Sequence, residues 1–187
     1  MARIPQVKFK VNLTELFGEK LSLNQATRES IGQAIIDKIV ERTQEQNVDK
    51  FGKTLGKYSD TYRKSLAFKV AKGGQSAVNL TLTGDMLASL TVLAQTDQTV
   101  TIGFDDSEQN AKAYGHISGM AGHPVLDGKV KVRDFMGLPK SELNAIAAEF
   151  EDQATVVDSI ESAQTRAQLD RAVLNLISEV SEEIEGG

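Results

Sequence analysis

The chain of 187 residues contains no cysteine and no tryptophan, and only two histidines. Without cysteine there is no disulfide framework, no thiolate metal site and no cysteine nucleophile. No apolar run approaches the roughly 18 residues that span a bilayer, and residues 1–10 lack the apolar core of a signal peptide. We therefore expect a protein without membrane contact that stays in the cytoplasm, or in a particle assembled there.

The composition is 40% hydrophobic and 25% charged, which is typical of a globular protein with one real core. Its net charge of −5 is unevenly distributed, because residues 1–150 carry +2 and residues 151–187 carry −7. Proteins that coat DNA usually have a strong excess of basic residues, since their affinity comes from neutralised phosphates. The charge balance therefore argues against a DNA-coating role for the whole chain.

The first third of the chain predicts one strand and two helices. Alternation of Val7, Phe9 and Val11 with lysines predicts a half-buried strand. Ser22 and Gln25 have the spacing of a capping box, so we expect a helix from there to about residue 46. Aliphatic residues recur every three or four positions in it and form one apolar stripe: Ile31, Ile35, Ile36, Ile39 and Val40.

Residues 53–72 are strongly basic, with Asp60 as the single acid. We expect a second, shorter helix from about residue 60 to 70 that carries Tyr62, Leu66 and Phe68, with residues 73 and 74, both glycine, ending it. The basic and aromatic mixture fits contact with a nucleic acid. A solvated helix face is the favoured interpretation, and pairing with the acidic tail of a neighbouring subunit is a third.

The middle third changes from helical to alternating periodicity. Strands are expected over residues 78–82, 90–94 and 100–104, with a hairpin loop at residues 96–98. A short helix is expected over residues 108–117, followed by a glycine-rich loop over 118–129 and an extended segment over 130–136.

The last third is predicted to be helical. Pro139 suits the first position of a helix, and apolar residues after it share one face: Leu143, Ile146, Ala147 and Phe150. Residues 152–165 keep a helical composition with a poorer stripe. A second clean stripe consists of Leu169, Val173, Leu176, Ile177, Val180 and Ile184. The sequence thus predicts an α+β fold: a small antiparallel sheet packed with helices in a core domain of residues 1–150, and an acidic helical extension of residues 151–187.

Three short motifs between residues 78 and 150 resemble those of one protein family. The first is Leu82-Thr83-Gly84-Asp85-Met86-Leu87-Ala88-Ser89-Leu90; the second is Val100-Thr101-Ile102-Gly103 with Tyr114 and His116 after it; the third is Arg133-Asp134-Phe135-Met136-Gly137-Leu138. Their order and rough spacing are similar to those of the phage virion morphogenesis, or tail-completion, family of Mu-like phages and prophages.

The resemblance implies a structural protein of a tailed bacteriophage rather than an enzyme. It would be a tail-completion or neck component at the head–tail junction of the virion. It would assemble into a homo-oligomeric ring, with a hexamer as one candidate size, and bind other tail or head-connector proteins. DNA would at most pass through its channel, and no cofactor is expected. The alternative is a small cytoplasmic adaptor that dimerises through its C-terminal helix.

Two kinds of residue are candidates for structural or interface roles. Leu82, Thr83 and Gly84 would end a strand at a tight turn, because glycine permits positive φ. Tyr114, His116 and Gly137 are the other motif positions with an expected structural role. On the extended segment, Arg133 would be a salt-bridge partner and Phe135 an anchor across a subunit seam. In the competing interpretation Phe135 belongs to the core and Arg133 to a surface ion pair. The stripe of Leu169, Val173, Leu176 and Val180 needs a partner to cover it.

Catalytic and metal chemistry have little support in the sequence. His116, His123 and Asp127 could form a weak metal site, but their spacing matches no established ligand pattern. Ser118 lies near His116, but neither a nucleophile elbow nor an orienting acid accompanies the pair. We therefore expect neither a catalytic nor a metal site.

Overall fold

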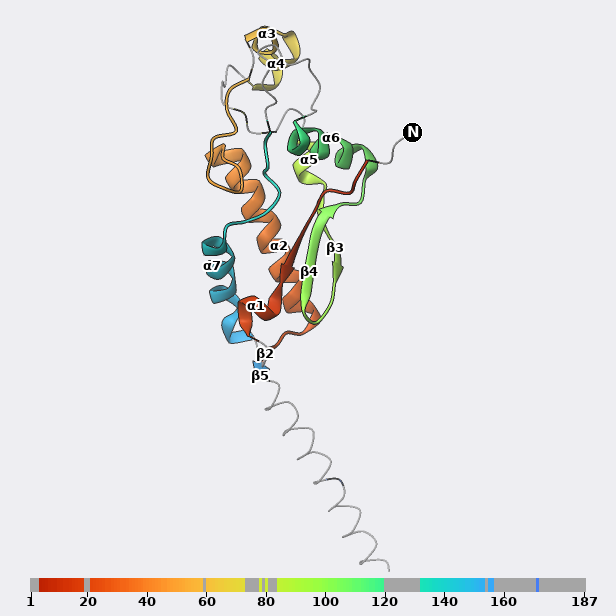
Figure 1. The fold of residues 1–187 in the computed structure, drawn as a ribbon, viewed down its shortest axis with the longest axis vertical. Helices are drawn as coiled ribbons and strands as arrows, with labels where there is room; N and C mark the ends of the chain where they lie inside the picture. Colours follow the sequence, from red (N-terminus) through yellow and green to blue (C-terminus); the bar gives the residue numbers. More distant parts are fainter. Residues whose placement is uncertain are drawn as a thin grey trace, which may run out of the picture.

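The computed structural model describes residues 4–18, 21–58, 60–72, 78, 80, 84–119, 132–153, 155, 156 and 171. In this part of the chain a small antiparallel sheet is packed with helices, so the predicted α+β class is confirmed (Figure 1). The stripe predicted for the C-terminal extension lies outside the described residues.

The sheet has three strands in the order β1-β4-β3, with β1 at Lys8–Asn12, β3 at Leu90–Gln95 and β4 at Thr99–Phe104. The three predicted strands of these regions are confirmed, as is the hairpin loop between β3 and β4. Phe9 pairs with Ile102 across β1 and β4, and a bulge interrupts the β3–β4 register between Val92 and Ala94. A short helix, α1 (Leu13–Phe17), follows β1 directly.

The long helix α2 (Gln25–Glu41) packs on β3 and β4 with one side and on α7 (Lys140–Phe150) with the other. This position between two layers explains why the predicted isoleucine stripe is buried. Gly32 permits the close approach of helix and sheet, because a Cβ there would lie 2.6 Å from Cγ2 of Val92. Each fully buried isoleucine contributes roughly 1.5–3 kcal/mol relative to exposure.

Both ends of α2 differ in detail from the prediction. Its N-cap is Asn24, whose side chain accepts a hydrogen bond of 2.8 Å from the N–H of Thr27; Ser22 instead belongs to the short strand β2 (Leu21–Ser22). After α2 the chain continues as a π-helical turn, η1 (Arg42–Gln46), so the predicted helical region does reach residue 46. Asn47 then ends it in the left-handed region with φ +57°.

Two helices cover the end of the sheet where β4 finishes. They are α5 (Asp85–Ala88) and α6 (Ser107–Ser118), and the latter confirms the helix predicted for residues 108–117. The buried side chain of Asn110 fixes the N-terminal segment to α6. It donates to the carbonyl oxygen of Pro5 (3.1 Å) and accepts from the N–H of Val7 (2.7 Å).

The basic stretch forms two short helices, α3 (Asp60–Arg63) and α4 (Leu66–Lys72), rather than the single helix predicted. The break lies at Lys64 and Ser65, and the Ser65 hydroxyl accepts from the N–H of Phe68 at the start of α4. The glycines expected to end this region lie outside the described residues.

Two predicted extended segments are wrong where they are described. Val78 and Leu80 are buried but belong to no strand, and Leu80 has φ +54°, a left-handed conformation that breaks any strand. Residues 132–135 pair with no strand either. The N–H of Phe135 donates to the carbonyl oxygen of Arg133 over 3.0 Å, which bends the backbone into a tight turn.

Secondary structure that pairs with the rest of the fold continues past the predicted domain boundary at residue 150. A 3₁₀ turn, η2 (Glu151–Gln153), follows α7, and the strand β5 (Thr155–Val156) pairs with β2. The side chains of Thr27 and Gln153 also form a hydrogen bond of 3.3 Å. The prediction of helix at residues 155 and 156 is therefore wrong, and pairing with the rest of the fold continues past residue 150 to Val156.

Candidate functional site

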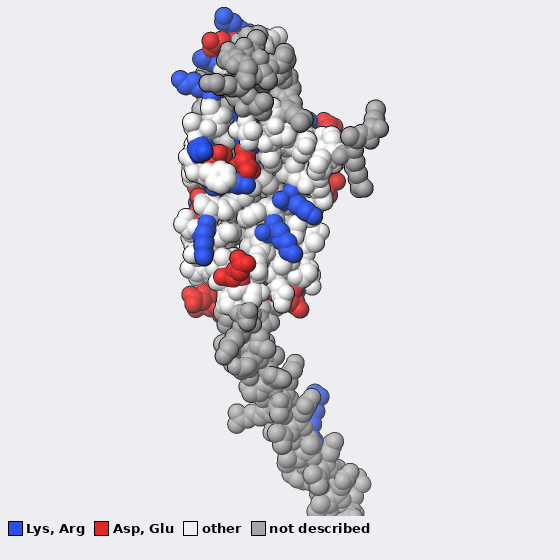
Figure 2. Space-filling model, viewed as in Figure 1, with Lys and Arg blue, Asp and Glu red and all other residues white. Residues whose placement is uncertain are grey.

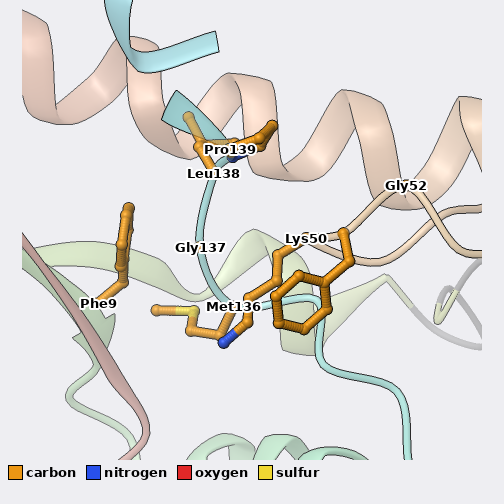
Figure 3. A pocket seen from close by; sticks show the side chains of 8 residues that line it. Phe9, Lys50, Gly52, Met136, Gly137, Leu138 and Pro139 are labelled. Carbon is orange, nitrogen blue, oxygen red and sulfur yellow. The ribbon is translucent and has the colours of Figure 1, made fainter. Parts of the chain in front are cut away.

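An open groove of about 490 Å³ lies among three chain segments that are distant in sequence (Figure 3). They are β1, the loop that follows η1, and the segment that leads into α7. The lining residues are mostly apolar, with one lysine: Phe9, Lys50, Phe51, Gly52, Met136, Gly137, Leu138 and Pro139. The third family-like motif thus supplies three of the residues that line the groove.

A buried arginine holds the motif segment in place. Nη2 of Arg42 donates to the carbonyl oxygens of Phe135 (3.2 Å) and Gly137 (2.5 Å). Arg42 is only 2% exposed, and its Nη1 lies 3.5 Å from Oε2 of Glu142, an ion pair without hydrogen-bond geometry. Burial lowers the pKa of Arg42, and the carboxylates of Glu142, Asp49 and Asp134 partly oppose that shift.

A second contact fixes the loop that forms the other wall. The carboxylate of Asp49 accepts from the N–H groups of Phe51 and Lys53, both at 2.9 Å, so residues 50–52 form a tight loop. Gly52 has φ +76°, which favours glycine at this position. The backbone N–H of Lys50 donates to the carbonyl oxygen of Asp134 (2.9 Å), which joins this loop to the motif segment.

Lys50 and Phe51 give the groove its polar and apolar edges. Nζ of Lys50 lies 2.6 Å from the carboxylate of Asp134 and 5.0 Å from the centre of the Phe51 ring. The Phe51 side chain is nonetheless 67% exposed, which is unusual for a large apolar residue. The groove therefore has an uncovered aromatic residue at its edge.

Gly137 forms part of the groove surface in a conformation that side chains rarely adopt, with φ +134°. A Cβ at this position would lie 3.4 Å from Cδ of Lys50 and 3.6 Å from the ring of Phe9. Any side chain here would occupy the space between those two residues. Gly137 therefore keeps the groove open in addition to permitting the turn.

Exposed lysines adjoin the groove in sequence on every segment that lines it. Lys53 follows Gly52 and Lys140 follows Pro139, whereas Lys8 and Lys10 flank Phe9 in β1 and so point to the other face of the sheet. On the face shown in Figure 2, basic side chains gather over β1 and over the start of α7. Among the described residues none of these four lysines forms an ion pair. The exposed Lys53 and Lys140 therefore lie next to the lining residues in sequence, while the lysine that lines the groove, Lys50, is paired with Asp134.

Two of the predicted site residues, His116 on α6 and Arg133 on the motif segment, are joined by a hydrogen bond. The N–H of Arg133 donates to the carbonyl oxygen of His116 (2.9 Å), and its Nε donates to that of Leu55 (3.2 Å). Burial lowers the pKa of His116 to about 4, and the positive charge of Arg133 adds to this effect. Burial also lowers the pKa of Arg133, while Tyr58 opposes the shift.

The other predicted site residues are placed as follows. Phe135 is fully buried, which agrees with the interpretation that it belongs to the core. None of its side chain is exposed in the folded chain to contact a neighbouring subunit. Arg133 is half-buried, and its side chain donates to the carbonyl oxygen of Leu55; among the described residues it forms no ion pair with the acid that was expected. Tyr114 packs partly buried against the core, and Gly84 caps α5 with φ +85°, as expected of a turn glycine. Six predicted residues lie outside the described part: Leu82, Thr83, Leu169, Val173, Leu176 and Val180.

Two aromatic residues of the basic stretch, Tyr58 and Phe68, pack against each other and do not form an exposed stacking surface. Tyr58 and Phe68 pack edge to face with ring centres 5.1 Å apart, and Phe68 is buried. The lysines and arginine around them are exposed: Lys53, Lys57, Arg63, Lys64 and Lys69. This arrangement supports a solvated basic surface more than base stacking.

Sequence reasoning missed Arg42, Lys50 and Phe51, the residues that shape the groove. A signal for Arg42 existed, since it continues the apolar stripe of α2 three residues after Ile39. A charged residue at a stripe position predicts a buried polar contact. Its partners, 93 and 95 residues away, could not be predicted from periodicity.

No group of three or more potential metal ligands occurs in the described ranges, which include His116 but neither His123 nor Asp127. Within the same ranges, none of the helices combines the length and apolar character needed to cross a bilayer. A scan against protein-family models finds no match for this chain, and searches of curated proteins and of solved structures also find none.

Proposed function

We propose that this chain is a structural protein of a tailed bacteriophage, a tail-completion or neck component that assembles into a ring at the head–tail junction. The observation that carries the proposal is the position of the third family-like motif. Phe135 fixes it in the core, while Met136, Gly137 and Leu138 line an open surface groove. A motif that builds a binding surface is what an assembly protein needs.

Other motif residues support the same interpretation, because they act on the fold and not on a reaction. Gly103 lies in β4 where a Cβ would be 2.7 Å from the carbonyl oxygen of Val7, so only glycine lets β1 approach. Gly84 starts α5 with a positive φ. His116 is half-buried, and its low pKa keeps it neutral at physiological pH.

Exposed apolar side chains supply further surface for contacts between subunits. On α4, Leu66 is 78% exposed and Val70 is 80% exposed, and the two are four residues apart, on one face of the helix. Together with Phe51 they leave apolar area in water that subunit contacts would cover. A ring needs two different patches on each subunit, because head-to-tail contacts close it.

The proposal is tested by solution mass and by particle composition. The purified full chain should form a discrete multimer in native mass spectrometry over the micromolar range, and ring-shaped particles in electron micrographs. Virions purified from a host that produces the chain should contain its peptides. A strict monomer that is also absent from virions would overturn the proposal.

The same measurements separate the ring component from the adaptor alternative. An adaptor that dimerises through its C-terminal residues would show a dimer mass and no larger species. Removal of residues 157–187 would convert it to a monomer, and it would be missing from virions.

A further inference from the structure

The groove combines an uncovered aromatic residue with unpaired positive charges. Phe51 is 67% exposed at its edge, and Lys53 and Lys140 adjoin the lining residues without ion pairs among the described residues. Such a surface is complementary to a segment that carries both large aliphatic side chains and carboxylates.

The chain itself contains a segment of this chemistry. After Arg171 the sequence has no lysine or arginine, while it has four glutamates: Glu179, Glu182, Glu183 and Glu185. Between and before them are the large aliphatic residues Val173, Leu174, Leu176, Ile177, Val180 and Ile184. Residues 172–187 therefore match the groove in charge and in apolar character.

The described fold ends away from its own groove. Pro139 of the groove caps the first turn of α7, whereas β5 follows the last turn of α7 and pairs with β2 (Figure 1). α7 alone spans roughly 16 Å at 1.5 Å per residue. The groove and β5 therefore lie near opposite ends of α7.

We infer that the groove of one copy binds residues 172–187 of a second copy, with Phe51 as the aromatic anchor and the surrounding lysines facing its glutamates. This inference deepens the proposed function and rests on it. Because the groove and the donated segment are different surfaces of one chain, the contact is head-to-tail, the type that closes into a ring.

The direct test is photo-crosslinking in the full chain with a benzophenone amino acid in place of Phe51. Position 51 is exposed, so the replacement should leave the core intact. Chains labelled with ¹⁴N and ¹⁵N are mixed, dissociated and reassembled before irradiation. Crosslinks from position 51 to residues 172–187 should join light to heavy chains. Crosslinks confined to chains of one isotope, or crosslinks to other segments, would overturn the inference.

Matched substitutions test the chemistry of the contact. Phe51→Glu should raise the dissociation constant of self-association about tenfold or more, as expected for an interface anchor. Ile4→Glu is the control, because Ile4 is also a large apolar residue, 47% exposed, but lies before β1 and outside the groove and the proposed contacts. Lys140→Glu should weaken assembly, and the combination with Glu182→Lys should restore part of it. Equal effects of Phe51→Glu and Ile4→Glu, with no rescue, would contradict the inference.

The outcomes distinguish failure of this inference from failure of the proposed function. If rings form and enter virions but position 51 crosslinks elsewhere, only the groove contact is wrong. If the chain is monomeric and absent from virions, the proposed function fails, and the head-to-tail contact fails with it.

Discussion

Nη2 of Arg42 lies 3.2 Å from the carbonyl oxygen of Phe135, and this bond joins positions 93 residues apart in the sequence. The guanidinium also bonds to Gly137, so one side chain fixes both the end of the α2 region and the segment that lines the groove. The first prediction concerns this contact.

Arg42→Met should lower the free energy of unfolding by about 2–4 kcal/mol, because it leaves the partly buried Glu142 and two backbone carbonyl oxygens without the guanidinium. Arg42→Lys should cost less, since it keeps the charge but loses the forked geometry. Urea denaturation followed by circular dichroism measures both. Asp97→Asn is the control: it removes the exposed partner of Arg28 and should leave the midpoint almost unchanged. Equal urea midpoints for Arg42→Met and wild type would show that Arg42 does not stabilise the fold.

Gly103→Ala should destabilise the fold by about 1–3 kcal/mol, because its Cβ would lie 2.7 Å from the backbone carbonyl oxygen of Val7. Gly32→Ala meets only side-chain atoms, those of Val92 and Val100, and also gains up to about 1 kcal/mol of helix propensity. Gly103→Ala should therefore shift the thermal midpoint more than Gly32→Ala. In a double-mutant cycle, Val92→Ala should cost less in the Gly32→Ala background than alone. The reverse order of the two alanine variants would contradict the close approach of β1 and β4.

The pKa of His116 is about 4 in the folded chain, whereas the unfolded chain has the ordinary value of 6.5. This difference predicts a pH dependence of stability. The unfolded chain binds a proton here more readily than the folded chain. The contribution is therefore fully present above pH 6.5 and is lost as the pH falls toward 4, up to roughly 3 kcal/mol. NMR titration of the two histidine rings should find one with a pKa near 4. In His116→Gln, the fall in stability over this pH window should be smaller than in wild type. Two histidines that both titrate near 6.5 would refute the burial argument.

Two truncations test where the folded unit ends. At a concentration at which the full chain is monomeric, a chain that stops at Val156 should have the same stability as the full chain, because it retains β5 and its pairing with β2. A chain that stops at Phe150 loses this pairing and the Thr27–Gln153 bond, and should be less stable by about 1–2 kcal/mol. Thermal unfolding of the two chains checks this. Equal midpoints would mean that β5 adds nothing to the core.

Local patterns were sufficient for much of the secondary structure. The alternation around Phe9, the isoleucines of α2 and the hairpin between β3 and β4 each depend on side chains close in sequence, and these predictions are confirmed. Capping was predicted less well, because Ser22 and Asn24 offer similar hydrogen-bond acceptors and only the pairing of β2 with β5 decides between them. Leu80 was assigned to a strand because its apolar side chain fitted an alternation that its positive φ breaks.

The sequence by itself determined the α+β class, the apolar faces that must be buried, and the separation of charge between the first 150 residues and the rest. Periodicity and composition are local properties, so they need no knowledge of distant partners. Only the tertiary structure decided that Phe135 is buried, that Arg42 fixes the segment after it, and that Phe9, Phe51 and Gly137 share one groove. These contacts join segments from β1, from the loop after η1 and from the approach to α7. Their side chains meet because the chain folds back on itself, and no local pattern encodes that meeting.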